Sequence, residues 1–276
     1  MTYKTILLHL DEQARRSERL AIGVRLAEAF DAQLIGAFAS TLPRVPAYAL
    51  VEAGGEVREL DERNRREAAS RAEKDFIDTA RRGAVRYEWR PAAEDDGQLE
   101  FLHDTRYADL VVAGQPDPED GAQRAFAGEV LLSCGRPLLF VPYAGSFQKL
   151  GQRVMVAWNG SRECARAVTD ALPFLRRAAG VDVVTFDTGK LRRSFVEPVE
   201  GEVAAWLARH GVKVTLSRHR TGDVDVGNQI LSRAADFGAD LIVMGAYGHS
   251  RVRELAFGGA TRALLESMTV PVLMSH

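Results

Sequence analysis

The stretch that decides the fold runs from Leu241 to Met268 and reads LIVMGAYGHSRVRELAFGGATRALLESM. It opens with an apolar run that ends at Gly245, continues through a glycine-bearing loop, and passes into a helical pattern. A strand, a glycine loop and a helix N-terminus in this order can bind an anion, because glycine lets backbone amides approach it and the helix dipole adds positive charge. The sequence therefore predicts a phosphate site in this stretch.

The glycines follow the spacing G-x2-G-x9-G-G, at Gly245, Gly248, Gly258 and Gly259. This spacing resembles the nucleotide loop of the universal stress protein family, whose ATP-binding members carry Ser or Thr after the third glycine. Because Gly259 holds that position here, a hydroxyl donor to the phosphates is missing, and Thr261 lies two residues further on. The resemblance implies ATP as the ligand, with or without Mg²⁺. The alternative is that the glycines only form a tight turn and a close helix contact.

The composition indicates an ordinary globular chain that is long enough for two domains. Its 276 residues are 46% hydrophobic and 27% charged, and the formal net charge is −2. This charge argues against a nucleic-acid-binding protein, which usually carries a basic excess. The apolar runs are too short for a transmembrane helix or a signal peptide, so we expect a cytoplasmic protein with no membrane partner.

The sequence contains none of the common catalytic or metal-binding motifs. Its two cysteines, Cys134 and Cys164, are far apart and lie on apolar helical patterns, which indicates buried thiols. The six histidines show no metal-ligand spacing, and the Walker, GxGxxG and GxSxG motifs are absent. We therefore expect no catalytic residues and no metal site, and at most a weak ATPase activity.

An internal repeat divides the chain into two similar halves. The segment ADLVVAG at 108–114 aligns with ADLIVMG at 239–245, and similar apolar runs follow both segments. Self-similarity at this scale indicates duplicated domains. We place them at residues 1–145 and 150–276, joined by a polar, glycine-containing linker.

Within each half, short apolar runs alternate with helical patterns. In the second half we expect strands at 153–158, 181–186, 212–217, 241–245 and 270–274, and helices at 163–179, 197–210, 226–237 and 260–268. Strands that are apolar on both faces and alternate with helices form a parallel sheet covered on both sides. The fold class is therefore α/β, with two tandem doubly wound, Rossmann-like domains, each a five-stranded parallel sheet with helices on both faces. A long charged helix at 56–82 distinguishes the first half.

The resemblance also implies which residues contact a nucleotide. In the universal stress protein family an Asp after the first strand contacts the nucleoside, and the backbone after the second strand reads adenine. Asn159 and Phe186 hold these positions in the second half. His249 and Arg251 could face the phosphates, although each could equally be a solvated loop charge. The predicted nucleotide site comprises Asn159, Phe186, Gly245, Gly248, His249, Arg251, Gly258, Gly259, Ala260 and Thr261.

The first half keeps the Asp of this pattern, Asp11, but has a degenerate nucleotide loop. Asp117 replaces the second glycine and Ala127 replaces the third. A carboxylate that faces a phosphate in a poorly solvated pocket would repel it. We therefore expect the second half to bind nucleotide and the first half not to.

Together with the resemblance, these observations imply a cytosolic stress-response protein that binds ATP in its C-terminal half and acts as a nucleotide-dependent regulatory or binding protein. Two alternatives stay open: a nucleotide-free interaction or dimerisation module, favoured by Gly259 and Asn159, and a weak ATPase on the same fold. The family commonly associates through its last strand. This habit implies an intrachain pseudo-dimer or a homodimer, with 138–141 and 270–274 as candidate edge strands.

Overall fold

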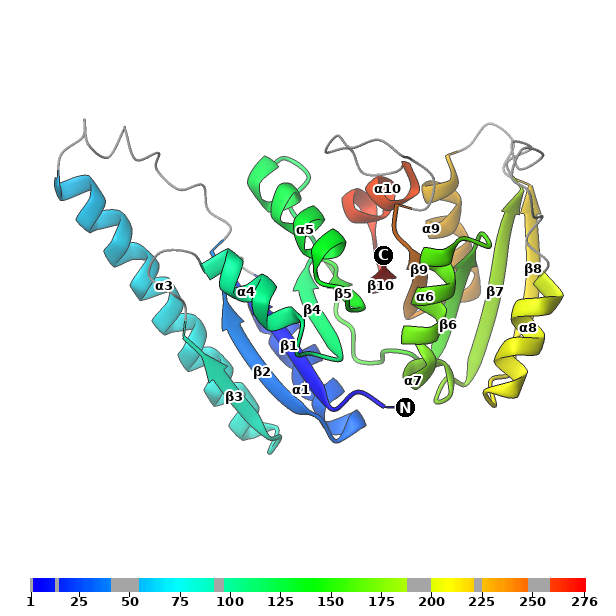
Figure 1. The fold of residues 1–276 in the computed structure, drawn as a ribbon, viewed down its shortest axis with the longest axis horizontal. Coiled ribbons are helices and arrows are strands. Elements are labelled where there is room, and N and C mark those ends of the chain that lie inside the picture. Colours follow the sequence, from blue (N-terminus) through cyan, green and yellow to red (C-terminus); the bar gives the residue numbers. More distant parts are fainter. Residues whose placement is uncertain are drawn as a thin grey trace.

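The structure is a computed structural model, and it describes residues 2–12, 15–40, 55–91, 97–187, 200–220, 225–247 and 259–276. These residues form one sheet of ten strands with helices on both faces (Figure 1). One side of the sheet packs against α1, α3, α6, α7 and α8, and the other against α4, α5, α9 and α10. No helix in the described ranges is both long and apolar enough to cross a membrane.

The first half contributes five parallel strands in the order β3-β2-β1-β4-β5. They are β1 (Thr5–Leu10), β2 (Gln33–Phe38), β3 (Tyr87–Arg90), β4 (Leu110–Gly114) and β5 (Leu138–Val141). The helices described in this half are α1 (Arg16–Phe30), α3 (Gly55–Arg82), α4 (Gly97–Thr105) and α5 (Gly121–Ser133). The long charged helix expected at 56–82 is therefore present as α3.

The second half repeats this arrangement in the order β10-β9-β6-β7-β8, again with parallel strands. The strands are β6 (Arg153–Trp158), β7 (Gly180–Asp187), β8 (Thr215–Arg220), β9 (Leu241–Gly245) and β10 (Val272–Ser275). Its described helices are α6 (Arg162–Asp170), α7 (Leu172–Leu175), α8 (Glu200–Arg209), α9 (Val226–Phe237) and α10 (Gly259–Ser267). The predicted doubly wound α/β class is confirmed.

Two elements of the second half differ from the prediction. The helix expected at 163–179 is divided into α6 and the short α7, where Pro173 has no N–H to continue the α6 ladder. The strand expected at 212–217 begins three residues later, as β8. Its first apolar residue, Val212, instead closes the preceding helix by donating from its N–H to Leu207 O at 3.0 Å. Gly211 makes this closure possible with a left-handed φ of 79°.

The two halves are joined edge to edge in the middle of the sheet. The two predicted edge strands pair with each other: β5 and β10 are antiparallel, with Phe140 opposite Val272 and Leu138 opposite Met274. Because β4 and β9 occupy their other sides, neither strand keeps an open edge for a second copy of the chain. Beside the seam, the Tyr3 hydroxyl donates a hydrogen bond to Asp170 O at 2.6 Å.

Candidate functional site

The strand order of the second half reverses between β6 and β9. From β6, the strands β7 and β8 continue on one side, and β9 and β10 lie on the other. The register places Ala157 beside Met244, so both strands end at the same edge of the sheet. In open parallel sheets, ligands bind in the crevice beyond the carboxyl ends of the strands at such a reversal. Asn159, after β6, and Gly245, at the end of β9, therefore lie where a ligand is expected.

Gly245 is a position of close backbone contact. A Cβ at this residue would lie 2.4 Å from Cys164 N and 2.6 Å from Glu163 C. Both atoms belong to the first turn of α6, which Ser161 caps by accepting a hydrogen bond from Cys164 N at 3.2 Å. Only glycine allows α6 to approach β9 this closely. Gly245 therefore has a packing role whether or not a ligand binds nearby.

Asn159 is exposed and helps to start α6. Its Oδ1 accepts a hydrogen bond from Ser161 N at 3.0 Å, which forms an Asx turn before the helix. The side-chain NH₂ group of Asn159 can donate two hydrogen bonds, and it donates none to the residues that the structure describes. This group can donate to a hydroxyl or phosphate oxygen of a ligand.

Gly259 opens α10 and is exposed. Among the described residues, a Cβ there would meet only Asp225 Oδ1, at 3.7 Å, which is ordinary van der Waals contact. A side chain at this position therefore has room next to the described residues. The amides of the first turn of a helix have no acceptor within the helix, and in α10 this turn begins at Gly259.

The next two residues of α10 are held inside the protein. Thr261 is buried, and its Oγ1 lies 3.5 Å from Tyr247 N, at the outer limit of a hydrogen bond. This contact ties the start of α10 to the chain just after β9. Ala260, Tyr247 and Phe186 all pack on the same hydrophobic core cluster. The Thr261 hydroxyl accepts this contact and is buried, so the backbone amides are the more accessible donors for a phosphate.

Asp225 brings a carboxylate to the same place. Its Oδ2 caps α9 by accepting from Gly227 N at 3.0 Å and from Asn228 N at 3.3 Å, and its Oδ1 faces the Cβ position of Gly259. The two helices come this close because Gly227 lacks a Cβ, which would lie 2.4 Å from Ala263 Cβ. A negative charge beside the start of α10 weakens the attraction of this helix end for a phosphate.

Phe186 is half-buried at the end of β7, opposite His219 of β8 in the register. The two rings lie 6.0 Å apart with an interplanar angle of 31°. His219 Nε2 is buried and has no hydrogen-bond partner among the residues that the structure describes. The sequence analysis missed His219, because the strand prediction ended at residue 217 and so did not place this ring beside Phe186.

Four predicted site residues, Gly248, His249, Arg251 and Gly258, lie outside the described residues. Their roles stay predictions. Within the described ranges, no three His, Cys, Asp or Glu side chains are grouped to hold a metal ion. Both cysteines are buried as predicted, and burial raises the pKa of the Cys164 thiol to about 11.

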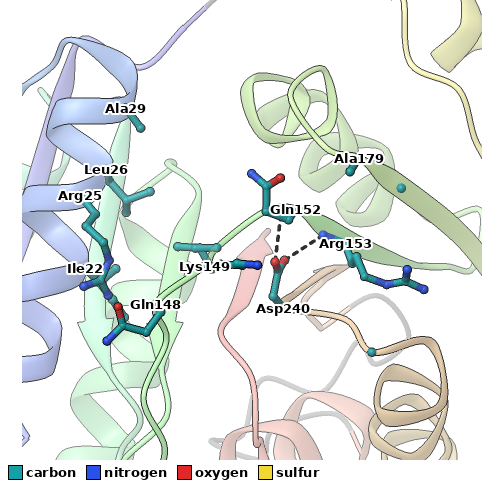
Figure 2. A pocket seen from close by; sticks show the side chains of 13 residues that line it. Ile22, Arg25, Leu26, Ala29, Gln148, Lys149, Gln152, Arg153, Ala179 and Asp240 are labelled. Carbon is teal, nitrogen blue, oxygen red and sulfur yellow. Dashed lines mark hydrogen bonds between the residues drawn. The ribbon is translucent and has the colours of Figure 1, made fainter.

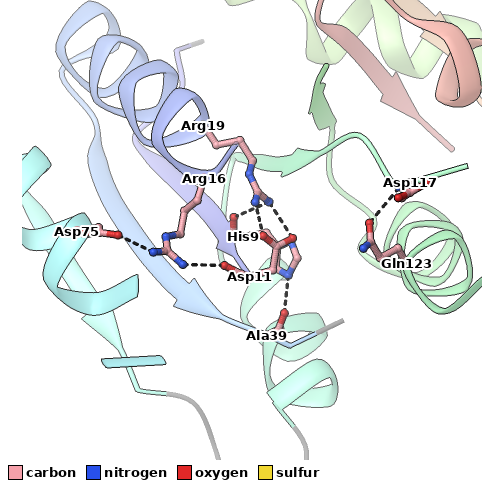
Figure 3. A network of polar contacts seen from close by, with 8 residues as sticks. All are labelled: His9, Asp11, Arg16, Arg19, Ala39, Asp75, Asp117 and Gln123. Atoms are coloured by element: carbon pink, nitrogen blue, oxygen red, sulfur yellow. Dashed lines mark hydrogen bonds and ion pairs between the residues drawn. The ribbon is translucent and has the colours of Figure 1, made fainter. Parts of the chain in front are cut away.

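In the first half, Asp11 is committed to a buried ion pair (Figure 3). Arg19 Nη1 donates to Asp11 Oδ2 at 3.1 Å, and Arg19 Nη2 contacts Asp11 Oδ1. Both residues are 1% exposed. His9 lies beside them, with its Nε2 2.9 Å from Ala39 O. The carboxylate that the resemblance assigns to a nucleoside is therefore neutralised from within the protein.

The start of α5 also differs from the start of α10. Ala127, which replaces the third glycine, lies buried inside α5 and not at its start. The first amides of α5 are satisfied by Asp120, whose carboxylate accepts from Ala122 N at 2.9 Å and Gln123 N at 3.1 Å. The repulsion expected from Asp117 requires a poorly solvated pocket, and the structure does not place Asp117 in one. Asp117 is exposed and accepts a hydrogen bond from Glu119 N at 2.9 Å.

The space around Asp11 is filled by rings. His9, Phe101 and Phe126 pack together, with centroid distances of 4.9 to 5.9 Å. The cavity that they line with Asp11 has a volume of about 20 Å³. A cavity of this size holds about one water molecule, far less than a nucleotide requires.

The buried His9 predicts a loss of stability in acid. Burial lowers the pKa of His9, an effect that Arg19 supports and Asp11 opposes. The unfolded chain therefore takes up a proton at a higher pH than the folded chain, so stability is full above the unfolded pKa of about 6.5 and falls as the pH drops below it. Urea unfolding at about pH 7.5 and about pH 5.5 measures the effect. His9→Gln, which cannot titrate, should show a smaller difference, and an unchanged difference would contradict the assignment.

Comparisons with known proteins place this geometry in context. Residues 151–276 match the model of Usp, the universal stress protein family. The whole chain is similar to a universal stress protein from Archaeoglobus fulgidus DSM 4304, with 15% identity, a TM-score of 0.73, and coverage of 98% of this chain and 95% of that one. The chain is also similar to a putative universal stress protein from Pseudomonas aeruginosa UCBPP-PA14, with 13% identity and a TM-score of 0.57. This match covers 99% of this chain and 93% of that one.

One half of the chain is also similar to a universal stress protein from Archaeoglobus fulgidus solved in complex with dAMP. The identity is 19% and the TM-score is 0.32, with coverage of 51% of this chain and 98% of that one. A search of curated proteins found no significant match.

Proposed function

Because residues 151–276 match the model of the universal stress protein family, we propose that the chain is a stress-response protein that binds an adenine nucleotide, ATP foremost, in its C-terminal half. It would act in the cytoplasm as a regulatory or binding protein whose contacts depend on the nucleotide. The observation that carries this proposal is the start of α10. Gly259 lies there exposed, beside the chain that follows β9, and among the described residues only Asp225 approaches its Cβ position.

The start of α10 has the properties of a phosphate site. First-turn amides that lack an acceptor point outward along the helix axis, and the helix dipole adds about half a positive charge. Asn159, across the strand-order reversal, offers its side-chain NH₂ group to a ribose or phosphate oxygen. Phe186 and His219 lie on the neighbouring strands β7 and β8. An aromatic ring beside a buried ring nitrogen suits a planar base.

The first half serves as an internal comparison. Asp120 occupies the amides that a phosphate would use, and Arg19 occupies Asp11. These two features favour one nucleotide per chain, bound in the second half.

Two observations favour the alternative of a nucleotide-free interaction module. Asp225 places a carboxylate beside Gly259, and the Thr261 hydroxyl already contacts Tyr247. Both reduce the affinity expected for a triphosphate, so the proposal is for modest binding. The two readings make opposite predictions for a direct titration.

Calorimetric titration with ATP should give about one site per chain, and a Gly259→Ser variant should bind about ten to a hundred times more tightly. The reason is that a hydrogen bond to a charged group contributes roughly 1.5 to 3 kcal/mol. Among the described residues none lies close enough to the Cβ position of Gly259 to obstruct Ser, so the melting temperature should be unchanged. No heat of binding to the folded protein and its variant would favour the nucleotide-free module.

Asp225→Asn is the matched control for charge at this site. Asn caps helices as well as Asp does, so α9 should keep its start while one negative charge beside Gly259 is removed. We expect tighter ATP binding and an unchanged affinity for adenosine, which carries no phosphate. If the affinities for ATP and adenosine increased equally, the phosphates would not lie over α10.

A further inference from the structure

A cleft of about 800 Å³ lies between the two halves, at the amino ends of β6 and β7 (Figure 2). One wall is α1 of the first half, and the floor is the connection that leads into β6. The opposite wall is formed by the residues that precede β7 and β9. Because the cleft adjoins the strand starts Arg153 and Gly180, it is separated from the ends of β6 and β9 by the length of the strands. It is therefore distinct from the candidate nucleotide site.

The charges around this cleft are mainly positive. Three cationic side chains line it, from Arg25, Lys149 and Arg153, against a single carboxylate, Asp240. Asp240 is already used by the backbone. Its Oδ1 accepts from Gly151 N at 2.9 Å and from Arg153 N at 3.1 Å, and its Oδ2 accepts from Gln152 N at 3.0 Å.

The three cations differ in how they are held. Arg153 Nε donates to Phe237 O at 2.9 Å, and its guanidinium lies over the Phe237 ring at 4.4 Å. Arg25 Nη2 donates to Phe147 O at 2.7 Å and has only a long ion pair with Glu18, at 3.7 Å. Lys149 is exposed and has neither a hydrogen bond nor an ion pair with any residue of the described ranges. Its ammonium group is available to a ligand.

The remainder of the lining is mixed: Gln148 and Gln152 are polar, and the apolar side chains of Ile22 and Leu26 are only 1% and 4% exposed. Ile22, Leu26 and Ala29 follow one another along one face of α1, and Leu150 and Ala179 continue this surface across the cleft. A volume of about 800 Å³ falls within the range of roughly 300–1,000 Å³ that is common for small-molecule sites. Such sites combine apolar walls with a few polar groups that orient the ligand.

We propose that this cleft binds a small organic anion with an apolar body, such as an aliphatic carboxylate or an aryl sulfonate. The acidic group would lie against Lys149 and Arg25, and the hydrocarbon would lie against Ala29, Leu150 and Ala179, the lining apolar residues that are not fully buried. The site takes its walls from both halves, so a bound ligand would bridge them. This proposal does not depend on nucleotide binding in the second half.

The test uses the full chain and the fluorescent anion anilinonaphthalene sulfonate. We expect saturable binding at about one site, weakened about tenfold or more by Lys149→Glu, because a hydrogen bond to a charged group is lost and a like charge is introduced. Lys74→Glu is the control, since Lys74 is an exposed lysine on α3, away from the cleft. Ala29→Trp tests the position of the site, because this exposed residue can place a large ring in the cleft without disturbing the core.

Competition tests the class of ligand. Octanoate should displace the probe, whereas octylamine, with the same hydrocarbon chain and the opposite charge, should not. Melting temperatures of the variants establish that each is folded. Equal probe affinity in the unchanged protein, Lys149→Glu and Ala29→Trp would overturn the proposal, and so would displacement by octylamine as effective as that by octanoate.

Discussion

Replacing Arg19 by Ala should lower the free energy of unfolding by about 3–5 kcal/mol, because the change leaves Asp11 as a buried charge without its partner. Arg19 and Asp11 are both 1% exposed, and two guanidinium nitrogens contact the two carboxylate oxygens. The cavity of about 20 Å³ beside the pair holds about one water molecule, which cannot replace all the guanidinium donors that are lost. Urea denaturation of the unchanged protein and the variant measures the difference.

Arg86→Ala is the matched control. Arg86 pairs with Asp31 at 2.9 Å, but the two side chains are 63% and 79% exposed, so solvent screens their attraction. Its loss should cost at most about 1 kcal/mol. Exchanging the whole buried pair for apolar residues, as in Asp11→Leu with Arg19→Met, should restore much of the stability lost in Arg19→Ala. A cost for Arg19→Ala no larger than that of Arg86→Ala would show that the pair is solvated.

This ion pair also marks where prediction from sequence reached its limit. Asp11 was predicted as a ligand contact of the family pattern, whereas its partner Arg19 was not singled out. Arginine on a helix usually lies in solvent, and nothing local to Arg19 shows that the helix turns it toward the end of β1. In the second half, the helix after the first strand buries Ala167 and Val168 at this level, and its one buried charge, Glu163, lies in its first turn. The duplicated fold was therefore predictable, but the different use of the two halves was not.

The elements that were predicted well are those whose periodicity has one physical cause. The strands at the centre of the sheet, such as β6 and β9, are apolar on both faces because helices cover both faces. The edge strand β8 is mostly exposed, so its hydrophobic pattern is weak. The strand was predicted to begin at Val212 because this residue is apolar, although Val212 closes the preceding helix. His219 was missed as a consequence. The seam between β5 and β10 was predictable because both are apolar and would otherwise be open edges.

The glycine spacing was predictable as a motif, but the sequence did not show that Gly245 serves packing whereas Gly259 lies at the candidate binding site. Gly245→Ala tests the packing role. We expect it to lower the free energy of unfolding by about 3 kcal/mol, at the upper end of the cost of overpacking. The new methyl carbon would lie 2.4 Å from Cys164 N and 2.6 Å from Glu163 C. These are backbone atoms in a capped first turn, so they cannot move aside as the end of a flexible side chain would. Denaturant unfolding measures the loss.

Gly259→Ala is the matched control, because it adds the same methyl group where the nearest atom is Asp225 Oδ1 at 3.7 Å. Its stability should stay within about 0.5 kcal/mol of the unchanged protein. The two variants then separate packing from binding: Gly245→Ala should unfold more easily, whereas Gly259→Ala should keep its stability and bind ATP no more tightly, since it adds no donor. If Gly245→Ala were as stable as Gly259→Ala, α6 would be free to move away from β9. The glycine at the end of β9 would then be explained by a ligand alone.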